Sequence, residues 1–219
     1  MKRFLFMLML CVLIATPALA APSYSGDMAW SRGDAGSTWQ EWTFSSNANP
    51  TAPDSSYNPY GDVSAAISGT GTIYFESYSG ASGVWGGDPL NVTLTIANNE
   101  ELNNYKEIWL EVIYRLDAES PSILPSFTTN PVATVELLSF ESTPLAPGTI
   151  QWYSGVYHWL ITPNPYSEQI CLQFTGTGGY VDSVSVDTIC ANTVPAPGAI
   201  LLGSLGVGLV GWMRRRRAM

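Results

Sequence analysis

Basic side chains are nearly absent from the long middle of this 219-residue sequence. The stretch Ala21–Thr193 contains three of them, Arg32, Lys106 and Arg115, beside all 18 acidic residues, so its net charge is −15. A surface with this balance repels the phosphates of nucleic acids. We therefore expect no nucleic-acid partner. The acidity is consistent with solubility, with binding of divalent cations, or with spacing in an anionic matrix.

Histidine is equally scarce, because His158 is the only one in the chain. Ser-His-Asp catalysis would have to use it, and a lone histidine between Tyr157 and Trp159 in an aromatic strand is usually structural. Zinc would need more than one histidine and two cysteines without ligand spacing. We expect no catalytic residue, no metal ligand and no cofactor, although loop carboxylates could bind calcium. The carboxylates considered for calcium are Asp54, Asp62, Asp182 and Asp187.

Only three cysteines occur, and two of them, Cys171 and Cys190, lie beyond the first twenty residues. In an oxidising compartment these two could form a disulfide. However, Gln169–Phe174 and Tyr180–Ile189 have the pattern of a hairpin joined by a glycine-rich turn, which would place Cys171 opposite about Ser183. Cys190 would then lie several residues beyond the reach of a bridge. Both outcomes stay open, and the hairpin favours free thiols.

Outside its two ends the sequence lacks any sustained apolar stripe of helical period, whereas alternation of apolar and polar residues is frequent. Alternation is clearest at Asn91–Ile96 and Val181–Val186, and it is typical of half-buried strands. Polar stretches at Ser45–Asp62 and Ala118–Thr129 predict surface loops. Seven or more short strands within one domain, residues 21–193, indicate an all-β fold with a single β-sandwich. The other predicted strands are Gly71–Ser77, Glu107–Leu116, Thr134–Ser142, Ile150–Tyr153 and Tyr157–Ile161.

The N-terminus has the three parts of a secretory signal peptide, residues 1–20. A basic start, Met1-Lys2-Arg3, is followed by the apolar run Phe4–Ala15, which is too short to be interpreted first as a membrane-spanning helix. Small side chains at Ala18 and Ala20 suit the pockets of signal peptidase. We therefore expect export, with cleavage between Ala20 and Ala21.

The C-terminus has the pattern of a membrane anchor. The short motif Val194-Pro195-Ala196-Pro197 precedes an apolar run, Gly198–Met213, and the basic cluster Arg214-Arg215-Arg216-Arg217 follows it. At about 1.5 Å per helical residue this run reaches roughly 24 Å, slightly less than a hydrocarbon core of about 30 Å. The arginines predict that the last residues stay in the cytoplasm and that the domain lies outside.

A short proline-containing motif, an apolar helix and a terminal arginine cluster together resemble the PEP-CTERM sorting signal. The resemblance covers residues 194–219, with Ala196 where the family usually has glutamate. It implies a single-pass inner-membrane intermediate that an exosortase processes at or near Val194-Pro195-Ala196-Pro197. It also implies delivery to the cell surface or extracellular matrix, in a setting of extracellular polysaccharide.

Carbohydrate binding is the leading specific expectation for the domain between these ends. The run Gly179–Thr188 resembles the last strand of jelly-roll domains of the galactose-binding and carbohydrate-binding-module kind. Exposed aromatic rings stack on the apolar faces of sugars, and Trp39, Trp42 and Trp85 are the candidates. Trp85 is the most suggestive of them, because we expect the glycine-rich stretch Gly80–Gly87 to be a loop. For Trp109, Trp152 and Trp159, in or beside predicted strands, a packed core is the better interpretation.

The sequence thus predicts an exported structural, adhesive or carbohydrate-binding protein, not an enzyme. Its expected partners are signal peptidase, an exosortase, the membrane and extracellular polysaccharide. The alternative is a secreted enzyme such as a glycoside hydrolase, for which the carboxylates are abundant. No recognisable motif pairs two of them.

Overall fold

The computed structural model describes residues 22–99, 104–117, 122–145, 151–175 and 178–191. The expected signal peptide, the Val194-Pro195-Ala196-Pro197 motif, the apolar run and the arginine cluster lie outside the described residues. Within those ranges no helix is both long and apolar enough to cross a membrane.

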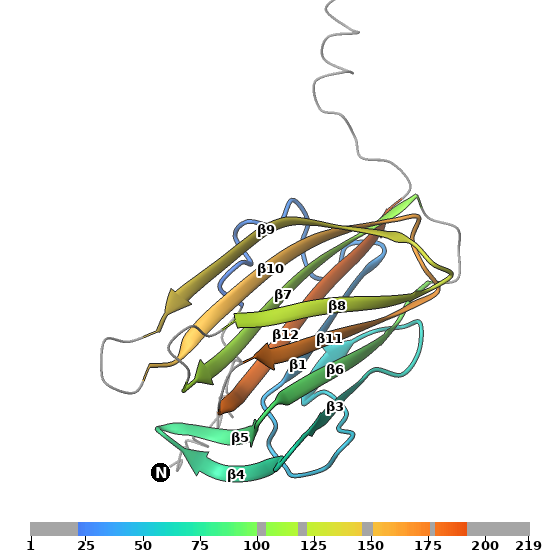
Figure 1. Cartoon of the computed structure of the whole chain (residues 1–219). Helices are drawn as coiled ribbons and strands as arrows, with labels where there is room; N and C mark the ends of the chain where they lie inside the picture. The colour runs from blue at the N-terminus through green and yellow to red at the C-terminus, as the bar shows by residue number, and fades with distance from the viewer. Residues whose placement is uncertain (1–21, 100–103, 118–121, 146–150, 176–177, 192–219) are drawn as a thin grey trace, which may run out of the picture.

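The described chain is all-β, as the alternation predicted, and its strands form two antiparallel sheets (Figure 1). In the large sheet the order is β2-β1-β12-β7-β10-β9, with β5 paired to β12 and β4 paired to β5. In the small sheet the order is β3-β6-β11-β8. The strands of the large sheet are β1 (Ser37–Trp42), β2 (Ser55–Tyr57), β4 (Ile73–Tyr78), β5 (Ala81–Gly87), β7 (Tyr105–Leu116), β9 (Thr134–Pro144), β10 (Tyr153–Thr162) and β12 (Gly179–Ala191). Those of the small sheet are β3 (Ser64–Gly69), β6 (Leu90–Ala97), β8 (Ser122–Asn130) and β11 (Ser167–Thr175).

One hydrophobic core joins the facing sides of the two sheets. Period-two alternation places the apolar side chains on the core side of each strand. In β6, for example, every second residue is fully buried while the residues between are half exposed. Strand β7 supplies the opposing layer from the centre of the large sheet, where β12 and β10 pair with it on either side. The core residues that these strands share are Leu90, Val92, Leu94, Ile96, Ile108, Leu110, Val112, Trp159, Ile161, Val184 and Val186.

The expected hairpin between Gln169–Phe174 and Tyr180–Ile189 is wrong. Both segments are strands, but β11 pairs with β6 and β8 in the small sheet, whereas β12 pairs with β1, β5 and β7 in the large sheet. Each strand has an apolar side that faces the shared core, and this pattern is satisfied equally well when the connection crosses between sheets. Strands that are neighbours in the sequence therefore need not be neighbours in a sheet.

Both Cys171 and Cys190 are free thiols. Cys171 lies on β11 of the small sheet and Cys190 on β12 of the large sheet. The two thiols are therefore apart because their strands belong to different sheets, not because of the register of a hairpin. Burial raises the pKa of the Cys190 thiol, and its sulfur lies 3.4 Å from Asn164 Oδ1. The thiolate, which is the reactive form, is therefore disfavoured there.

Two other sequence expectations need correction. Most of the loop expected at Ala118–Thr129 is strand β8, an edge strand that tolerates Pro125 because it pairs with β11 alone. The glycine-rich stretch around Trp85, interpreted as a loop, is strand β5. By contrast, Ser45–Asp62 contains only the three-residue strand β2 and is mostly loop, as expected.

Candidate functional site

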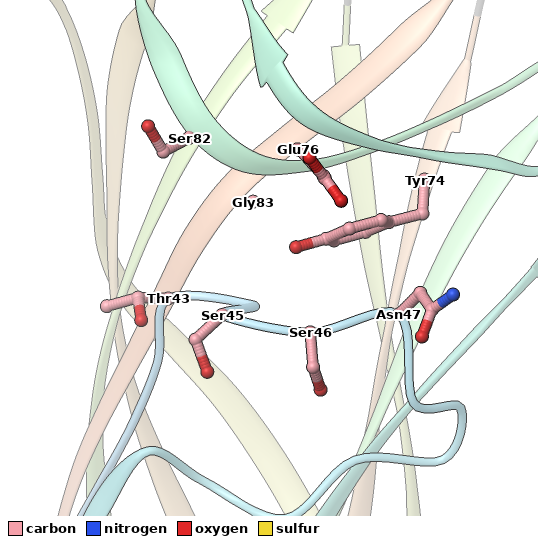
Figure 2. Close-up of a pocket in the computed structure, with 8 residues that line it drawn as sticks. All are labelled: Thr43, Ser45, Ser46, Asn47, Tyr74, Glu76, Ser82 and Gly83. Atoms are coloured by element: carbon pink, nitrogen blue, oxygen red, sulfur yellow. The ribbon is translucent and has the colours of Figure 1, made fainter.

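A polar groove lies between the loop that follows β1 and the β4–β5 hairpin. Figure 2 shows Thr43, Ser45, Ser46 and Asn47 along one side, with Tyr74 and Glu76 of β4 and Ser82 of β5 on the other. The groove has a volume of about 710 Å³, within the range of sites for small ligands. Its lining consists of Thr43, Ser45, Ser46, Asn47, Tyr74, Glu76, Ser82 and Gly83.

The Asp54 carboxylate holds the loop side of this groove in place. Its Oδ2 accepts hydrogen bonds from the Thr43 amide at 2.7 Å and from the Thr43 hydroxyl at 3.1 Å, and its Oδ1 accepts one from the Ser45 hydroxyl. The Asp54 amide in turn donates to the Glu41 carbonyl at 2.9 Å. This local network fixes the loop as it leaves β1, so the groove wall is preorganised.

The other side approaches the loop closely because residue 83 is glycine. Gly83 has a φ of +75°, and a Cβ there would meet the Phe44 carbonyl oxygen at 2.4 Å and that of Thr43 at 2.6 Å. Phe44 is itself buried, with a φ of 49°. Any side chain at position 83 would therefore push β5 away from the loop and widen the groove.

Tyr74 is the aromatic residue of the groove. Its hydroxyl donates to the Phe44 carbonyl at 3.0 Å, and its ring packs against the buried Trp85 with centroids 5.2 Å apart. In Figure 2 the ring reaches from β4 across the space towards the loop. Fixed at both ends, it offers a rigid, half-exposed aromatic surface to a ligand.

Polar groups around this ring are free to bind a ligand. Among the described residues, the side chains of Asn47, Glu76 and Ser82 have no hydrogen-bond partner, and all three are exposed. An amide, a carboxylate and a hydroxyl together can both donate to and accept from a ligand rich in hydroxyl groups. None of these three residues was predicted from the sequence, because they are scattered over three segments and form no motif.

The tryptophans predicted to form a sugar platform do not form one. Trp42 and Trp85 are buried members of the core, and their rings are closed to a ligand. Trp39 is half buried, but the Arg32 guanidinium lies over its ring, 4.7 Å from the centroid. Of the residues expected to be core, Trp109 and Trp159 are buried, whereas Trp152 is half exposed just before β10.

Arg32 occupies the face of the large sheet that points away from the core. Its Nε and Nη2 donate to the two carboxylate oxygens of Asp187 at 2.6 and 2.8 Å, and its Nη1 donates to Glu41 at 2.5 Å. The Tyr24 hydroxyl also donates to Asp187, at 2.7 Å. Burial opposes the charge on Arg32, but the hydrogen bonds to Asp187 and Glu41 outweigh it and raise the pKa of the guanidinium. The segment that carries Tyr24 and Arg32 is thereby fixed to the sheet.

His158, the only histidine, takes part in a packed cluster on the same face. Its ring stacks on Trp109 with centroids 3.9 Å apart, and Trp109 stacks on Tyr24 at 5.6 Å. His158 Nε2 and Trp109 Nε1 each lie 2.9 Å from Glu107 Oε1. Burial tends to raise the pKa of Glu107, but hydrogen bonds from His158 and Trp109 outweigh this and lower it. This geometry holds the imidazole in place between its ring neighbour and its carboxylate.

A second cavity, of about 280 Å³, lies where β12 bulges. The register between β12 and β7 shifts between Val181 and Ser183, so Asp182 is the extra residue of the bulge. Asp182 lines this cavity with Trp152, Leu145 and Ile113, among others, and burial raises the pKa of its carboxyl to about 6. Such a carboxyl holds a proton at mildly acidic pH.

Three of the four carboxylates considered for calcium serve separate parts of the fold, and the fourth, Asp62, is exposed. Asp54 holds the groove loop, Asp187 binds Arg32, and Asp182 lies in the bulge. In the ranges that the structure describes, no three histidine, cysteine, aspartate or glutamate side chains gather as a metal site would require.

Comparisons with protein-family models, with curated proteins and with solved structures found no match for this chain.

Proposed function

We propose that the chain is an exported, non-enzymatic protein of the cell surface or extracellular matrix, and that its domain binds a polysaccharide in the groove beside Tyr74. The observation that carries the proposal is the groove itself, in which a fixed aromatic ring lies among unpaired hydroxyl, amide and carboxylate groups. Sugars present an apolar face, which can stack on the ring, and many hydroxyls, which can form hydrogen bonds with the polar groups.

Charge narrows the class of polysaccharide. The domain carries a net charge of −15, and Glu76 adds a carboxylate within the groove. Like charges repel an anionic polymer from such a surface. Neutral glycans, or glycans with free amino groups, are therefore the proposed ligands.

The ends of the chain supply the cellular setting of the proposal. Cleavage after Ala20 would release the domain from its signal, and the tail that resembles PEP-CTERM would hold it in the inner membrane until an exosortase acts near Val194. The two sheets with their shared core are consistent with a jelly-roll-like sandwich as the part that reaches the surface.

A glycoside hydrolase is the second candidate, and Asp182 is the observation that favours it. A carboxyl with a pKa of about 6 beside Trp152 suits a general acid. Glycoside hydrolysis usually needs a second carboxylate, and Asp182 is the only carboxylate among the described residues that line this cavity. Polysaccharide cleavage that Asp182→Asn abolishes, with the fold intact, would establish this alternative.

Binding is tested by the retardation of the protein in native gels that contain neutral, amino-sugar or anionic polysaccharides. Glu76→Gln and Asn47→Ala each remove a ligand contact, and we expect affinity to fall about tenfold or more, as for a lost hydrogen bond to a charged or buried partner. Glu136→Gln is the matched control, because it removes the same charge from an exposed position on β9. Equal retardation of all variants would refute the groove as the binding site.

Sorting is tested separately, by the mass of the mature protein from envelope and medium fractions. Our proposal expects a species that begins at Ala21 and ends near Val194. A mature chain that still carries Arg217 would refute processing by an exosortase while leaving the membrane anchor in place.

A further inference from the structure

Lys106, the only lysine of the domain, is buried with two polar partners. Its Nζ contacts Asn98 Oδ1 and Glu168 Oε1, and Asn98 Nδ2 donates to Glu168 Oε2 and, at 3.0 Å, to the Pro165 carbonyl. The exposed fractions are 0% for Lys106, 1% for Glu168 and 3% for Asn98. A lysine is almost never buried so completely in a folded protein, so this cluster calls for an explanation.

The surroundings of the cluster exclude water. In the large sheet Lys106 pairs with Ile161 on β10 and with Cys190 on β12, and both are buried. In the small sheet Glu168 pairs with Ile96, which is also buried. In such apolar surroundings an ammonium and a carboxylate are costly to keep as separate charges. A neutral lysine amine is a nucleophile.

We propose that Lys106 and Asn98 become joined by an amide bond between their side chains, with Glu168 as the catalytic residue. The amine lies against the carboxamide of Asn98, and Glu168 contacts both reacting groups. Holding nucleophile, electrophile and proton carrier in one fixed, dry place is what allows such a reaction to proceed without an external enzyme.

The reaction balances without any further reactant. Glu168 takes a proton from the Lys106 ammonium, and the amine attacks Cγ of Asn98, which opens the carbonyl double bond to an oxyanion. Glu168 then carries a proton from the attacking nitrogen to the leaving amide nitrogen. The C–N bond of the Asn98 carboxamide breaks, the carbonyl re-forms, and one ammonia molecule leaves. Nothing is oxidised or reduced. The released ammonia takes up the proton that remains on Glu168, so the carboxylate returns to its starting state.

The bond would join the two sheets. Asn98 directly follows β6 of the small sheet, and Lys106 is the second residue of β7 in the large sheet. The link would close one end of the shared core covalently, in a domain where Cys171 and Cys190 form no disulfide. It does not depend on what the groove binds.

The direct test is the intact mass of the exported protein, measured after denaturation. The proposal expects a chain lighter than its sequence by one ammonia molecule. Digestion at Glu100 or Glu101, which lie between the two residues, should leave the Asn98 and Lys106 peptides attached to each other, and trypsin should not cut after Lys106. A wild-type chain of full mass, with normal cleavage after Lys106, would overturn the proposal.

Variants separate this reaction from other losses of ammonia. Cyclisation of Asn98 onto the following backbone amide would also release ammonia, but it would persist in Lys106→Arg, whereas the proposed bond requires full mass in that variant. Glu168→Gln should likewise have full mass, and its fold can be checked by circular dichroism. Asn98→Asp should lose water instead of ammonia. The exposed Asn104→Asp is the control and should still lose ammonia.

Discussion

Arg32 and Lys106 both bind carboxylates that the fold has buried, but the two clusters are built differently. Arg32 lies on the outer face of the large sheet, and its planar guanidinium binds Asp187 with two parallel hydrogen bonds and Glu41 with a third. Lys106 lies between the sheets, where a single nitrogen contacts both a carboxylate and a carboxamide. The domain has only three basic residues, and two of them pair with buried carboxylates.

The difference follows from the chemistry of the two cations. A guanidinium keeps its proton in proteins, matches a carboxylate in shape and stacks on aromatic rings, as Arg32 does on Trp39. It can stabilise but it cannot attack. An ammonium can lose its proton in an apolar environment and then has a lone pair to react with. A cation paired with a buried carboxylate can therefore stabilise the fold at one site, as Arg32 does, and form a reaction centre at the other, as we propose for Lys106.

The largest effect is expected for Arg32→Met, which leaves Asp187 and Glu41 without their cation. Breaking a buried ion pair from one side costs about 3–5 kcal/mol of the free energy of unfolding, which urea denaturation measures. Arg115→Met is the control for charge, because the Asp117 side chain that pairs with Arg115 is 37% exposed. Its cost should be about 1 kcal/mol or less. If the two variants lost the same free energy of unfolding, the ion pairs of Arg32 would not stabilise the fold more than an exposed pair does.

A smaller effect is expected for Tyr24→Phe, which removes the hydroxyl that donates to Asp187. A hydrogen bond to a charged group contributes about 1.5–3 kcal/mol, and urea denaturation at pH 7 should show this loss. Burial, then the charge of Asp187, raises the pKa of Tyr24 well above its ordinary value of about 10. The folded state therefore holds this proton more tightly, so its contribution is complete below about pH 10 and is lost as the pH rises further.

The stability of wild type and of Tyr24→Phe should depend differently on pH. Wild type should lose stability more steeply than Tyr24→Phe between about pH 10 and 11. Parallel curves above pH 10 would show that Tyr24 does not share a buried hydrogen bond with Asp187.

The smallest effect concerns Asp182, a partly buried carboxyl with no basic partner among the described residues. Its pKa of about 6 exceeds the unfolded value of about 3.9, so its stabilising contribution is present below about pH 4 and is lost as the pH rises to 6. Asp182→Asn removes this penalty and should be more stable than wild type at pH 7. Because Asp182 is partly exposed, screening reduces the gain to about 1 kcal/mol.

Calorimetric melting at several pH values checks this third prediction. The two proteins should melt together at pH 3 and separate above pH 6. A gain that does not change with pH would point to packing in the cavity beside Trp152 instead of to the charge.

Residue pattern predicted much of the fold and little of the candidate site. Alternation located β6 and much of β12, because each faces the core on one side, and the other predicted strands overlap β4, β7, β9 and β10. Strand β5 was missed because its glycines suggested a loop. Gly83 admits the Phe44 carbonyl, and a Cβ on Gly86 would meet the Tyr180 ring at 2.8 Å. These glycines serve close packing, and the sequence offers no way to distinguish that role from flexibility.

The groove residues were missed for a related reason. Trp42 and Trp85 were favoured as ligand contacts because they are aromatic, and for the same reason the fold buries them. The half-exposed ring beside the groove is Tyr74, which β4 positions against Trp85. Exposure depends on which face of a strand meets the core, and the sequence around β4 and β5 does not indicate it.

By itself the sequence determined the excess of acidic residues, the period-two alternation behind the all-β fold, and the segments at each end from which export and anchoring are predicted. Only the tertiary structure decided which charges meet. Arg32 binds a carboxylate 155 positions away, and Lys106 binds one 62 positions away. Such contacts depend on sheet order and strand register, which arise when all strands bury their apolar faces together. Local pattern gives each strand its buried side but does not specify its neighbours.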